Sequence, residues 1–481
     1  MRHIITPEQM RRVEQAAFDA GVLSLDLMER ASRAVADALV HMLGGAAGKT
    51  VVFFCGAGNN GGDGLAAARL FALQGGQAHI VLMDEPSTPD AGTNLHRAKQ
   101  MGLPVHEDLP PHIHADAAVD ALFGIGLNRP LEGRAAALVH QINALGVPVL
   151  AVDIPSGMDA LTGRSLGVTV RAQRTITFHR LKTGHCLAAD QEALGALTVA
   201  NIGLMDPPDM QAFEALEEGD LATQLPVRPR AAHKGSNGRV LLYCGSLGMA
   251  GAAAMAALGC LRAGAGLVTI ACDERIIPVL QVLAPNATCL PLAQALDAPP
   301  RHDVLLAGCG LGKGPGVWQG LSRLYDAGQP AVLDADALNL LAQHPMRLGS
   351  RTVITPHVGE AARLLDQTPE QVAGDMLAAG RALHARYGGV SLLKSHCSMI
   401  TDGERQGLNT VGSPVLAKGG SGDALAGIVA GLMAQGMAAY DAARTGALWL
   451  GKASLLAEQR HGVYSALTGE VLALMGEAAR P

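Results

Sequence analysis

Two glycine-rich stretches hold the residues with which this chain could do chemistry. The first, VVFFCGAGNNGGDG at residues 51–64, has the spacing GxGxxG at Gly56, Gly58 and Gly61. An apolar run precedes it and the helical pattern GLAAARLFALQG follows, so bare backbone could bring amides to a pyrophosphate at a helix N-terminus. On this triplet alone, an ordinary dehydrogenase with Asp84 as its ribose-binding acid fits equally well.

The second stretch, VLAKGGSGDALAGIVAGLMAQG at residues 415–436, predicts a glycine turn that opens a helix. Amides at such a helix N-terminus can hold a transferring phosphoryl group, and Asp423 could take the proton of a hydroxyl. For this motif by itself, a glycine-rich cap with an incidental aspartate fits about as well. Earlier strand ends carry residues that could order Mg²⁺ and a substrate: Asp334, Asp336, His357 and Glu360.

The first stretch is more polar than phosphate binding requires, because Asn59, Asn60 and Asp63 all lie in what the pattern predicts to be its loop. Two later strand ends carry further oxygen-bearing groups, Asp120 in VDALFGIG and Ser156 in VDIPSGMD. Neighbouring parallel strands end at one crevice, so Asn60, Asp120 and Ser156 could converge on an alkali or alkaline-earth cation. Each alone fits a turn residue better. Three at successive strand ends favour the cation site.

Short apolar runs alternate with helical patterns, which predicts an α/β protein with parallel sheets covered by helices on both faces. The patterning fails between residues 208 and 225, where proline, glycine and charge accumulate. We therefore expect two domains, residues 1–210 and 225–481, the first a Rossmann-like three-layer αβα sandwich. Strands are expected at residues 50–56, 78–84, 117–124, 147–157 and 174–180, and then at 238–246, 266–272, 303–310, 330–338, 351–356 and 391–400.

Composition excludes several classes of function. A net charge of −6 gives no surface for nucleic acid, and we see neither a signal region at the N-terminus nor an apolar run of membrane-spanning length. The 8 cysteines never fall in CxxC spacing, and most lie in predicted strands as small buried hydrophobes. We expect a cytoplasmic enzyme without nucleic-acid or membrane partners, assembled as a homo-oligomer.

The first half resembles the NAD(P)H-hydrate epimerase family over about residues 1–205, through LMERA, GAGNNGGDGLAAAR, DALFGIGL and DIPSGMD. The resemblance implies K⁺ ligands at Asn60, Asp120 and Ser156, and proton transfer by Asp153, which also contacts the substrate. The other residues it implies in binding the hydrated dinucleotide are Asn59, Asn60, Gly61, Gly62, Asp63, Gly124, Ile125, Gly126, Leu127, Asn128, Arg129 and Pro130.

The second half resembles the ADP/ATP-dependent NAD(P)H-hydrate dehydratase family over about residues 225–475, through CGLG, DADALN, TPHVGE and GGSGDALAG. The resemblance implies a ribokinase-like αβα fold and Mg²⁺ with ADP or ATP. Hydrate binding is implied for Ala263, Gly312, His357 and Asp423, and nucleotide binding for Lys394, Ser395, His396, Cys397, Ser398 and Gly422. The chain departs from the family at Val358, where proline is usual, and at KSHCS, where smaller residues are usual.

Together the two resemblances imply repair of a nicotinamide ring that has gained a hydroxyl at C6. Phosphorylation would turn that hydroxyl into a good leaving group, and an epimerase would convert the R-hydrate to the S-hydrate that the dehydratase accepts. Three alternatives stay open from the residues alone. A kinase for a small alcohol explains only GGSGD, a dehydrogenase explains only GAGNNG, and a nonenzymatic binding module explains neither set of acids.

Overall fold

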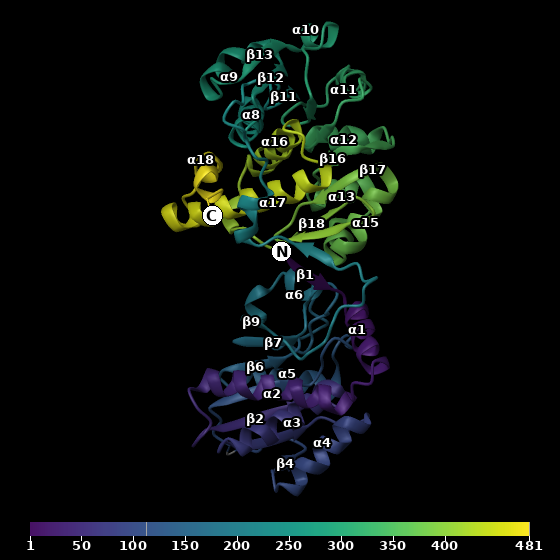
Figure 1. Ribbon diagram of the computed structural model, residues 1–481, viewed down its shortest axis with the longest axis vertical. Coiled ribbons are helices and arrows are strands. Elements are labelled where there is room, and N and C mark those ends of the chain that lie inside the picture. The colour runs from purple at the N-terminus through teal and green to yellow at the C-terminus, as the bar shows by residue number, and fades with distance from the viewer. Residues whose placement is uncertain (112, 481) are drawn as a thin grey trace. The chain divides into compact units, whose positions relative to one another are not determined.

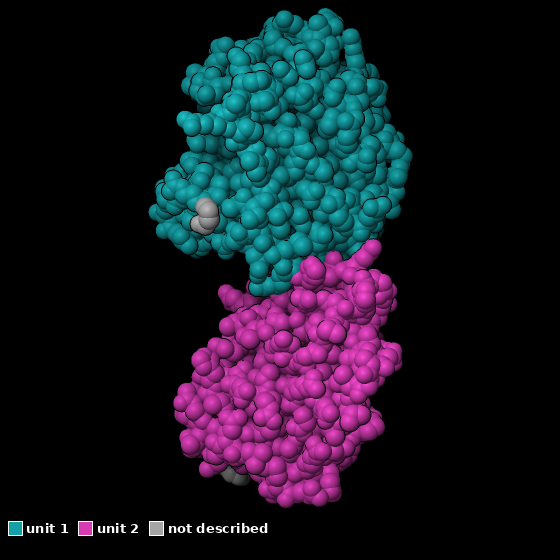
Figure 2. All heavy atoms as spheres, in the orientation of Figure 1, with its two compact units in different colours: residues 1–2, 213–481 teal, residues 3–212 magenta. Residues whose placement is uncertain are grey.

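The structure, a computed structural model, describes residues 1–111 and 113–480 and contains two compact units (Figure 2). The N-terminal unit comprises His3–Ala212, and the C-terminal unit runs from Phe213 onward and includes Met1 and Arg2. The division between Ala212 and Phe213 falls inside the segment 208–225. The last position of the second expected domain, residue 481, lies outside the described residues.

The N-terminal unit is built on a parallel sheet with the strand order β4-β3-β2-β5-β6-β7-β9 (Figure 1). The chain starts the sheet at β2, adds β3 and β4 on one side, and returns to place β5 on the other side. The crevice beside β2 and β5 is therefore the switch point where such sheets bind ligands. The strands are β2 (Thr50–Cys55), β3 (Gln77–Leu82), β4 (Val105–His106), β5 (Ala117–Ala121), β6 (Val149–Val152), β7 (Arg174–Phe178) and β9 (Ala196–Ala200).

Helices cover both faces of this sheet because alternate strand residues point to opposite sides. Phe53 belongs to the core under four helices, α1 (Pro7–Asp19), α2 (Ser24–Leu43), α3 (Asn59–Leu73) and α4 (Pro89–Gln100). Its neighbour Phe54 belongs to the core under α5 (Gly133–Ala144) on the other face. Two short strands, β1 (Arg2–Ile5) and β8 (Leu181–Lys182), pair with each other, and α6 (Thr183–Leu187) follows β8 directly.

The C-terminal unit has a larger sheet with the order β13-β12-β11-β14-β15-β16-β17-β18-β19-β10. It is parallel through β17, and β18 is antiparallel to both of its neighbours. Its switch point lies between β11 and β14. The strands are β10 (Phe213–Ala215), β11 (Arg239–Tyr243), β12 (Leu267–Cys272), β13 (Thr288–Pro291), β14 (Val304–Ala307), β15 (Ala331–Leu333), β16 (Leu348–Ile354), β17 (Gly388–Leu393), β18 (Ser398–Thr401) and β19 (Gln406–Asn409).

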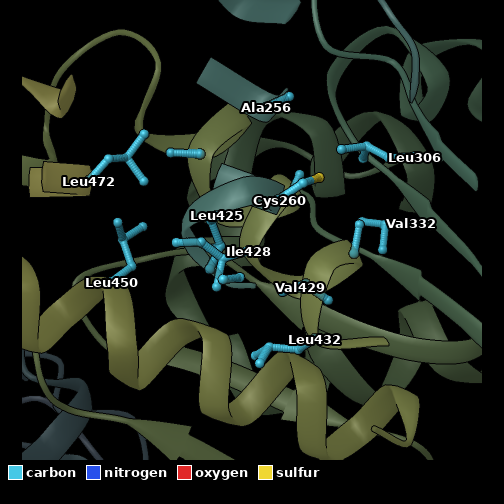
Figure 3. Packing of buried hydrophobic residues seen from close by; sticks show 14 of the residues in the cluster. Ala256, Cys260, Leu306, Val332, Leu425, Ile428, Val429, Leu432, Leu450 and Leu472 are labelled. Atoms are coloured by element: carbon cyan, nitrogen blue, oxygen red, sulfur yellow. The ribbon is translucent and has the colours of Figure 1, made fainter. Parts of the chain in front are cut away.

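Four helices bury the main hydrophobic core of this unit (Figure 3): α8 (Ala250–Arg262), α16 (Ser421–Ala434), α17 (Ala439–His461) and α18 (Thr468–Ala478). α8 and α16 pack backbone to backbone, because glycines and alanines line their contact. The remaining helices are α7 (Leu221–Gln224), α9 (Ile277–Leu283), α10 (Leu292–Asp297), α11 (Val317–Tyr325), α12 (Ala335–Gln343), α13 (Val358–Leu365), α14 (Pro369–Gly374) and α15 (Met376–Tyr387).

The α/β class with parallel sheets is confirmed, and each expected apolar run contains a strand. Two expectations are wrong. Asn59, Asn60 and Asp63 lie in the first turns of α3 rather than in a loop, because the helix begins at Asn59. Only Cys55, Cys272 and Cys289 lie in strands, since the other cysteines occupy helices or strand-end loops. In the described part of the chain, no helix combines the length and apolarity that a membrane crossing requires.

The contact between α8 and α16 gives a stability prediction. A Cβ at Gly427 would lie 2.1 Å from the carbonyl oxygen of Ala256, which is backbone and cannot rotate away. Gly427→Ala should therefore lower the free energy of unfolding by about 1–3 kcal/mol, the usual cost of overpacking. The measurement is urea unfolding of the C-terminal unit.

Gly476→Ala is the matched control, because Gly476 is an exposed position of α18 where a methyl group would meet nothing within 4 Å. That variant should gain roughly 0.5–1 kcal/mol from the better helix propensity of alanine. Equal responses from the two variants would contradict the close-packing argument.

Candidate active sites

The first candidate site lies where β2 ends and α3 begins. Gly58 is the N-cap of α3, and nothing lies within 4 Å of a Cβ placed on it, so a ligand can approach its backbone. Gly56 and Gly61 serve packing instead. A Cβ on Gly61 would lie 1.8 Å from the carbonyl oxygen of Gly56, and one on Gly56 would lie 1.9 Å from that of Leu122. The GxGxxG spacing thus fits α3 tightly against the sheet and leaves one glycine open to solvent.

Asp120 and Ser156 meet at the ends of neighbouring strands. The Ser156 hydroxyl donates to Asp120 Oδ1 at 2.6 Å, and the Ser156 amide donates to Oδ2 at 2.7 Å. Asp120 is fully buried, and among the described residues no ion pair reaches it. Burial raises the pKa of Asp120 to about 6, although the bonds from Ser156 and the Leu122 amide lower it. A buried carboxylate without a cationic partner is what a cation-binding position requires.

Asp153 follows β6 and is held in the left-handed backbone region at φ 66°. Lys182 Nζ and Thr177 Oγ1 both donate to Asp153 Oδ1 at 2.8 Å. Burial alone would raise the pKa of Asp153, but the ammonium of Lys182, its hydrogen bond and the Thr177 hydroxyl together hold that pKa below its ordinary value. Asp153 is therefore an ionised carboxylate at neutral pH.

Two other carboxyl groups beside Asp153 are shifted the opposite way. Burial and the charge of Asp153 raise the pKa of Asp63 well above its ordinary value, and the same two causes raise the pKa of Glu14. Neighbouring carboxyl groups whose pKa values are driven apart provide a base and an acid in one site. Asp153 fits the base, and Asp63 fits the acid.

The structure brings some of the predicted substrate residues together around Gly124. A Cβ on Gly124 would lie 3.0 Å from Asn60 Oδ1 and 3.2 Å from Asp153 Oδ2, so these oxygens face the turn after β5. Farther along this turn, Leu127 is buried in the core beneath α5, so its side chain packs and does not point to a ligand. The exposed members of the turn are Gly126, Asn128, Arg129 and Pro130, while Ile125 is half-buried.

The second candidate site lies at the N-terminus of α16. Gly420 is the N-cap at φ 90°, and Ser421, Gly422 and Asp423 form the first turn, whose amides point out of the helix end. Burial and the charge of Asp334 raise the pKa of Asp423 to about 6. Asp423 is thus poised near neutrality, which suits a general base.

Asp334 and Lys394 form a buried ion pair beside Asp423. Lys394 Nζ lies 2.7 Å from Asp334 Oδ1, which also accepts from Thr355 Oγ1 at 2.8 Å. A Cβ on Gly422 would lie 3.2 Å from Lys394 Nζ, so any side chain there would crowd this ammonium. Gly422, Asp423 and Lys394 are therefore brought together, as the sequence predicted for the site.

His357 is the N-cap of α13, and its ring is partly committed to that helix. Nδ1 accepts hydrogen bonds from the amides of Gly359 and Glu360, and the Glu360 carboxylate accepts from the His357 amide. Nδ1 therefore carries no proton, whereas the side chain is 55% exposed and its Nε2 lies 3.5 Å from Glu360 Oε1. His357 and Lys394 lie side by side in an isolated parallel bridge, which places His357 at the same end of the sheet.

The residues predicted to bind nucleotide form the turn between β17 and β18. Ser398 Oγ accepts from the Ser395 amide at 3.3 Å and so closes the turn. Ser395 and His396 are exposed, whereas Cys397 is 1% exposed and points into the protein. The departure KSHCS therefore alters the surface of the turn mainly at His396.

Gly312 and Ala263 lie in different surroundings from each other. The Gly312 amide donates to Asp336 at 2.8 Å in the loop after β14. Ala263 is buried at the C-terminus of α8, and a Cβ on Gly431 would lie 3.0 Å from its methyl group. Gly431 is eight residues after Asp423, or about 12 Å along α16. The structure thus does not place Ala263 next to Asp423.

Several residues in these sites escaped the sequence reasoning. Lys182 comes from a strand of two residues, and Glu14 from the exposed-looking face of α1, so neither carries a motif signal. Thr177 lies inside the expected strand 174–180, where its hydroxyl reads as an ordinary strand residue. The ion pair between Asp334 and Lys394 joins two residues that were considered only separately.

Comparison with known proteins assigns both halves of the chain. The family described as YjeF-related protein N-terminus matches residues 24–184, and the family described as NAD(P)H-hydrate dehydratase matches residues 240–474. The bifunctional NAD(P)H-hydrate repair enzyme Nnr of Moorella thermoacetica is 34% identical over 98% of this chain and 95% of its own. The corresponding enzyme of Escherichia coli is 33% identical over 98% and 93%. The chain belongs to this family of bifunctional repair enzymes.

Solved structures agree for the C-terminal unit. The ADP/ATP-dependent NAD(P)H-hydrate dehydratase of Bacillus subtilis, co-crystallised with ATP and Mg²⁺, covers 56% of this chain and 98% of its own, with 27% identity and a TM-score of 0.51. A ribokinase-like superfamily protein of Enterococcus faecalis covers 58% and 100%, with 29% identity and a TM-score of 0.51. The ribokinase-like fold expected for this unit is confirmed.

The buried pair of Lys182 and Asp153 gives a prediction that needs no substrate. Lys182→Met should leave an uncompensated buried carboxylate and lower the free energy of unfolding at neutral pH by about 3–5 kcal/mol. The depressed pKa of Asp153 contributes stability that is present above the unfolded pKa and is lost as pH falls through the folded pKa. The gap between wild type and variant should therefore shrink on acidification. Urea unfolding between neutral and acidic pH measures it.

Lys49→Met provides the control for that comparison. Lys49 pairs with Asp116 at 3.0 Å on the surface, and both side chains are more than one-third exposed. Solvent screens such a pair, so this variant should lose little stability at any pH. A Lys182 variant that behaves like the Lys49 variant would show that Lys182 does not hold the charge of Asp153.

Proposed function

We propose that this chain repairs hydrated nicotinamide dinucleotides: it epimerises the R- and S-hydrates of NAD(P)H and dehydrates the S-hydrate with ADP or ATP. The observation that carries the proposal is Asp423, whose pKa is raised by burial to about 6 at an amide-rich helix N-terminus beside Lys394. A base, backbone amides and an ammonium group together suit the transfer of a phosphoryl group to a hydroxyl. The N-terminal unit holds a separate acid–base site, which suits the epimerisation.

In the dehydratase, Asp423 takes the proton of the C6 hydroxyl as its oxygen attacks the terminal phosphorus of the nucleotide. The amides of the first turn of α16 and the ammonium of Lys394 then neutralise charge on the phosphoryl oxygens. With ADP, this step yields the C6 phosphate ester and AMP. Loss of phosphate from C6 and of a proton from C5 restores the double bond of NAD(P)H, because phosphate is a far better leaving group than hydroxide.

The nucleotide is assigned to the β17–β18 turn, residues Lys394 to Ser398, and to Gly422. We assign the hydrate to Asp423, Gly312 and His357, with Ala263 a more distant contact beside Gly431, which lies about 12 Å along α16 from Asp423. The acids Asp334, Asp336 and Glu360 lie at the ends of β15 and β16 and offer the hard oxygen ligands that Mg²⁺ prefers. Mg²⁺ would supply charge neutralisation for the nucleotide phosphates at this edge.

In the epimerase, the substrate carbon C6 carries both a hydroxyl and the ring nitrogen N1. Asp153 accepts the hydroxyl proton while the C6–N1 bond breaks, and Asp63 supplies a proton to N1. The open form is an aldehyde at C6, and rotation about the C5–C6 bond exposes its other face. Reclosure with the proton transfers reversed gives the other epimer. The opposed pKa shifts of Asp153 and Asp63 provide both groups in the required state.

The residues proposed to hold K⁺ fit that ion. Asp120 supplies a buried carboxylate without an ion pair among the described residues, and Ser156 supplies a hydroxyl in contact with it. The Asn60 amide nitrogen is buried without a hydrogen-bond partner, so reversing that amide would present an oxygen there at little cost. Bound K⁺ would supply the positive charge that Asp120 lacks and would order the turn after β5.

Each compact unit carries one of the two activities in this proposal, and the enzyme works in the cytoplasm. Buried thiols such as Cys244, Cys260 and Cys309 suit a reducing compartment. Assembly as a homo-oligomer stays a prediction from the sequence, and light scattering of the purified chain measures it.

The function itself is tested by incubating the purified protein with R- and S-hydrates, with each nucleotide and without any.

Asp423→Asn should abolish nucleotide-dependent dehydration and leave epimerisation near its normal rate. The amide cannot accept a proton, and loss of a general base typically costs about 10²–10⁴ in rate. In the wild type, dehydration should fall about tenfold per pH unit below about 6, as Asp423 becomes protonated. Steady-state assays of both activities across pH measure these effects. Full dehydratase activity in the variant would remove Asp423 from the mechanism.

Asp120→Ala should weaken epimerisation and its response to K⁺ while sparing dehydration. Asp120 carries the only full charge among the three proposed ligands, so its loss should exceed that of Ser156→Ala. Epimerisation of the R-hydrate is measured across K⁺ concentrations, alongside thermal unfolding. A lowered melting temperature with an unchanged K⁺ response would show that Asp120 only supports the turn after β5.

A further inference from the structure

A thiol lies among the acids of the dehydratase site, and the proposed mechanism makes no use of it. The ligand atoms of Cys309, Asp334 and Asp423 all lie within 4.8 Å of one another. Cys309 follows β14 and is fully buried, Asp334 follows β15 and is 2% exposed, and Asp423 is half-buried. Residues that follow two strands and begin one helix therefore converge on one small volume.

The oxygen atoms of Asp334 are divided between two directions. Oδ1 accepts from both Thr355 and Lys394, so its hydrogen-bonding capacity is used. Oδ2 lies toward the first turn of α16, since a Cβ on Gly422 would be 3.8 Å from it. This second oxygen is thus available on the same side as Asp423.

The charges around this volume match a divalent cation. In the metal-bound form, once Cys309 has lost its proton, the thiolate, the two carboxylates and the Lys394 ammonium leave two net negative charges to balance the metal in a mostly buried space. A mixed set of one sulfur and two oxygens suits Zn²⁺ or Cd²⁺, which accept thiolate ligands, whereas Mg²⁺ prefers oxygen alone. Three protein ligands also leave a fourth tetrahedral position for water.

We infer that Cys309, Asp334 and Asp423 form a site for a thiophilic divalent cation, Zn²⁺ or Cd²⁺, whose binding switches off dehydration. On binding, the S–H bond of Cys309 breaks, its proton passes to solvent, and the sulfur bonds to the metal. Asp423 then donates its electron pair to the metal and can no longer take a proton from a hydroxyl. The metal site exists independently of the proposed function, and only the inhibition depends on it.

The first test follows binding by the full-length protein and requires no substrate. Titration with Cd²⁺, with a non-thiol reductant present, should produce the ultraviolet charge-transfer absorption of a cadmium–thiolate bond. Cys309→Ser should remove the absorption and weaken Cd²⁺ binding by at least about 10–100-fold, the loss that even an outer-shell partner of a metal ligand causes. Mg²⁺ alone should produce no such absorption, because it prefers oxygen ligands.

Two further variants make the test specific. Cys289→Ser removes a half-buried thiol on β13, outside the cluster, and should bind Cd²⁺ like wild type. Asp423→Asn replaces a charged oxygen ligand with a neutral amide and should weaken Cd²⁺ binding while retaining the thiolate absorption, so the inference is testable even if Cys309→Ser folds poorly. Retention of the absorption in a folded Cys309→Ser protein would overturn the site.

The second test measures inhibition, with the N-terminal unit as an internal control. Zn²⁺ should inhibit dehydration of the S-hydrate at concentrations that leave epimerisation of the R-hydrate unchanged, and Cys309→Ser should relieve that inhibition. Equal inhibition of both activities, or inhibition that survives in Cys309→Ser, would overturn the switch. If the chain dehydrates nothing but binds Cd²⁺ through Cys309, the proposed function fails and the metal site stands.

Discussion

Both units depend on the same interaction, a buried aspartate at a strand end that is paired with one lysine and one threonine. Asp153 accepts from Lys182 and Thr177, each at 2.8 Å, and Asp334 accepts from Lys394 at 2.7 Å and Thr355 at 2.8 Å. A carboxylate buried without such partners would take up a proton or unfold its surroundings. In each pair the lysine and the threonine share Oδ1, which leaves Oδ2 directed toward the proposed ligand.

That arrangement constrains the backbone around it. Asp153 is at φ 66° and Ala335, directly after Asp334, is at φ 48°, a region that non-glycine residues rarely occupy. Such a conformation persists only where neighbouring structure fixes it. The hydrogen bonds to Oδ1 and the parallel strands on both sides supply that restraint. Close packing of α3 against β2 and of α16 against α8 then aims each helix N-terminus at the same crevice as its carboxylates.

The sequence predicted the parts of each site that lie in continuous motifs. Asp120 and Asp153 could be found because each lies at the end of an apolar run, before the glycines of GIG and before the turn residues PSG respectively. Asp423 could be found because it follows the glycines of GGSG at the start of a helical pattern. Lys182 could not, since its partner Asp153 is 29 residues away and its own strand has two residues. The start of α3 was missed because two asparagines and two glycines have poor helix propensity, and tertiary packing overrides it. Ala263 was placed by resemblance alone, and the structure buries it against Gly431.

The two sites use opposite electrostatic means to obtain a base. In the N-terminal unit, Lys182 keeps Asp153 ionised, and the resulting charge helps keep the protons on Asp63 and Glu14. In the C-terminal unit, Lys394 is bound to Asp334, and burial together with the charge of Asp334 raises the pKa of Asp423 to about 6. Ring opening needs an acid and a base at once, so the first site separates its pKa values. Phosphoryl transfer from a nucleotide needs only a base that is nearly as strong as neutral pH permits, so the second site raises the pKa of a single carboxyl group, Asp423. The chemistry of each step thus accounts for the choice of carboxylate that the lysine pairs with: the base Asp153 in the first unit, and Asp334, the neighbour of the base, in the second.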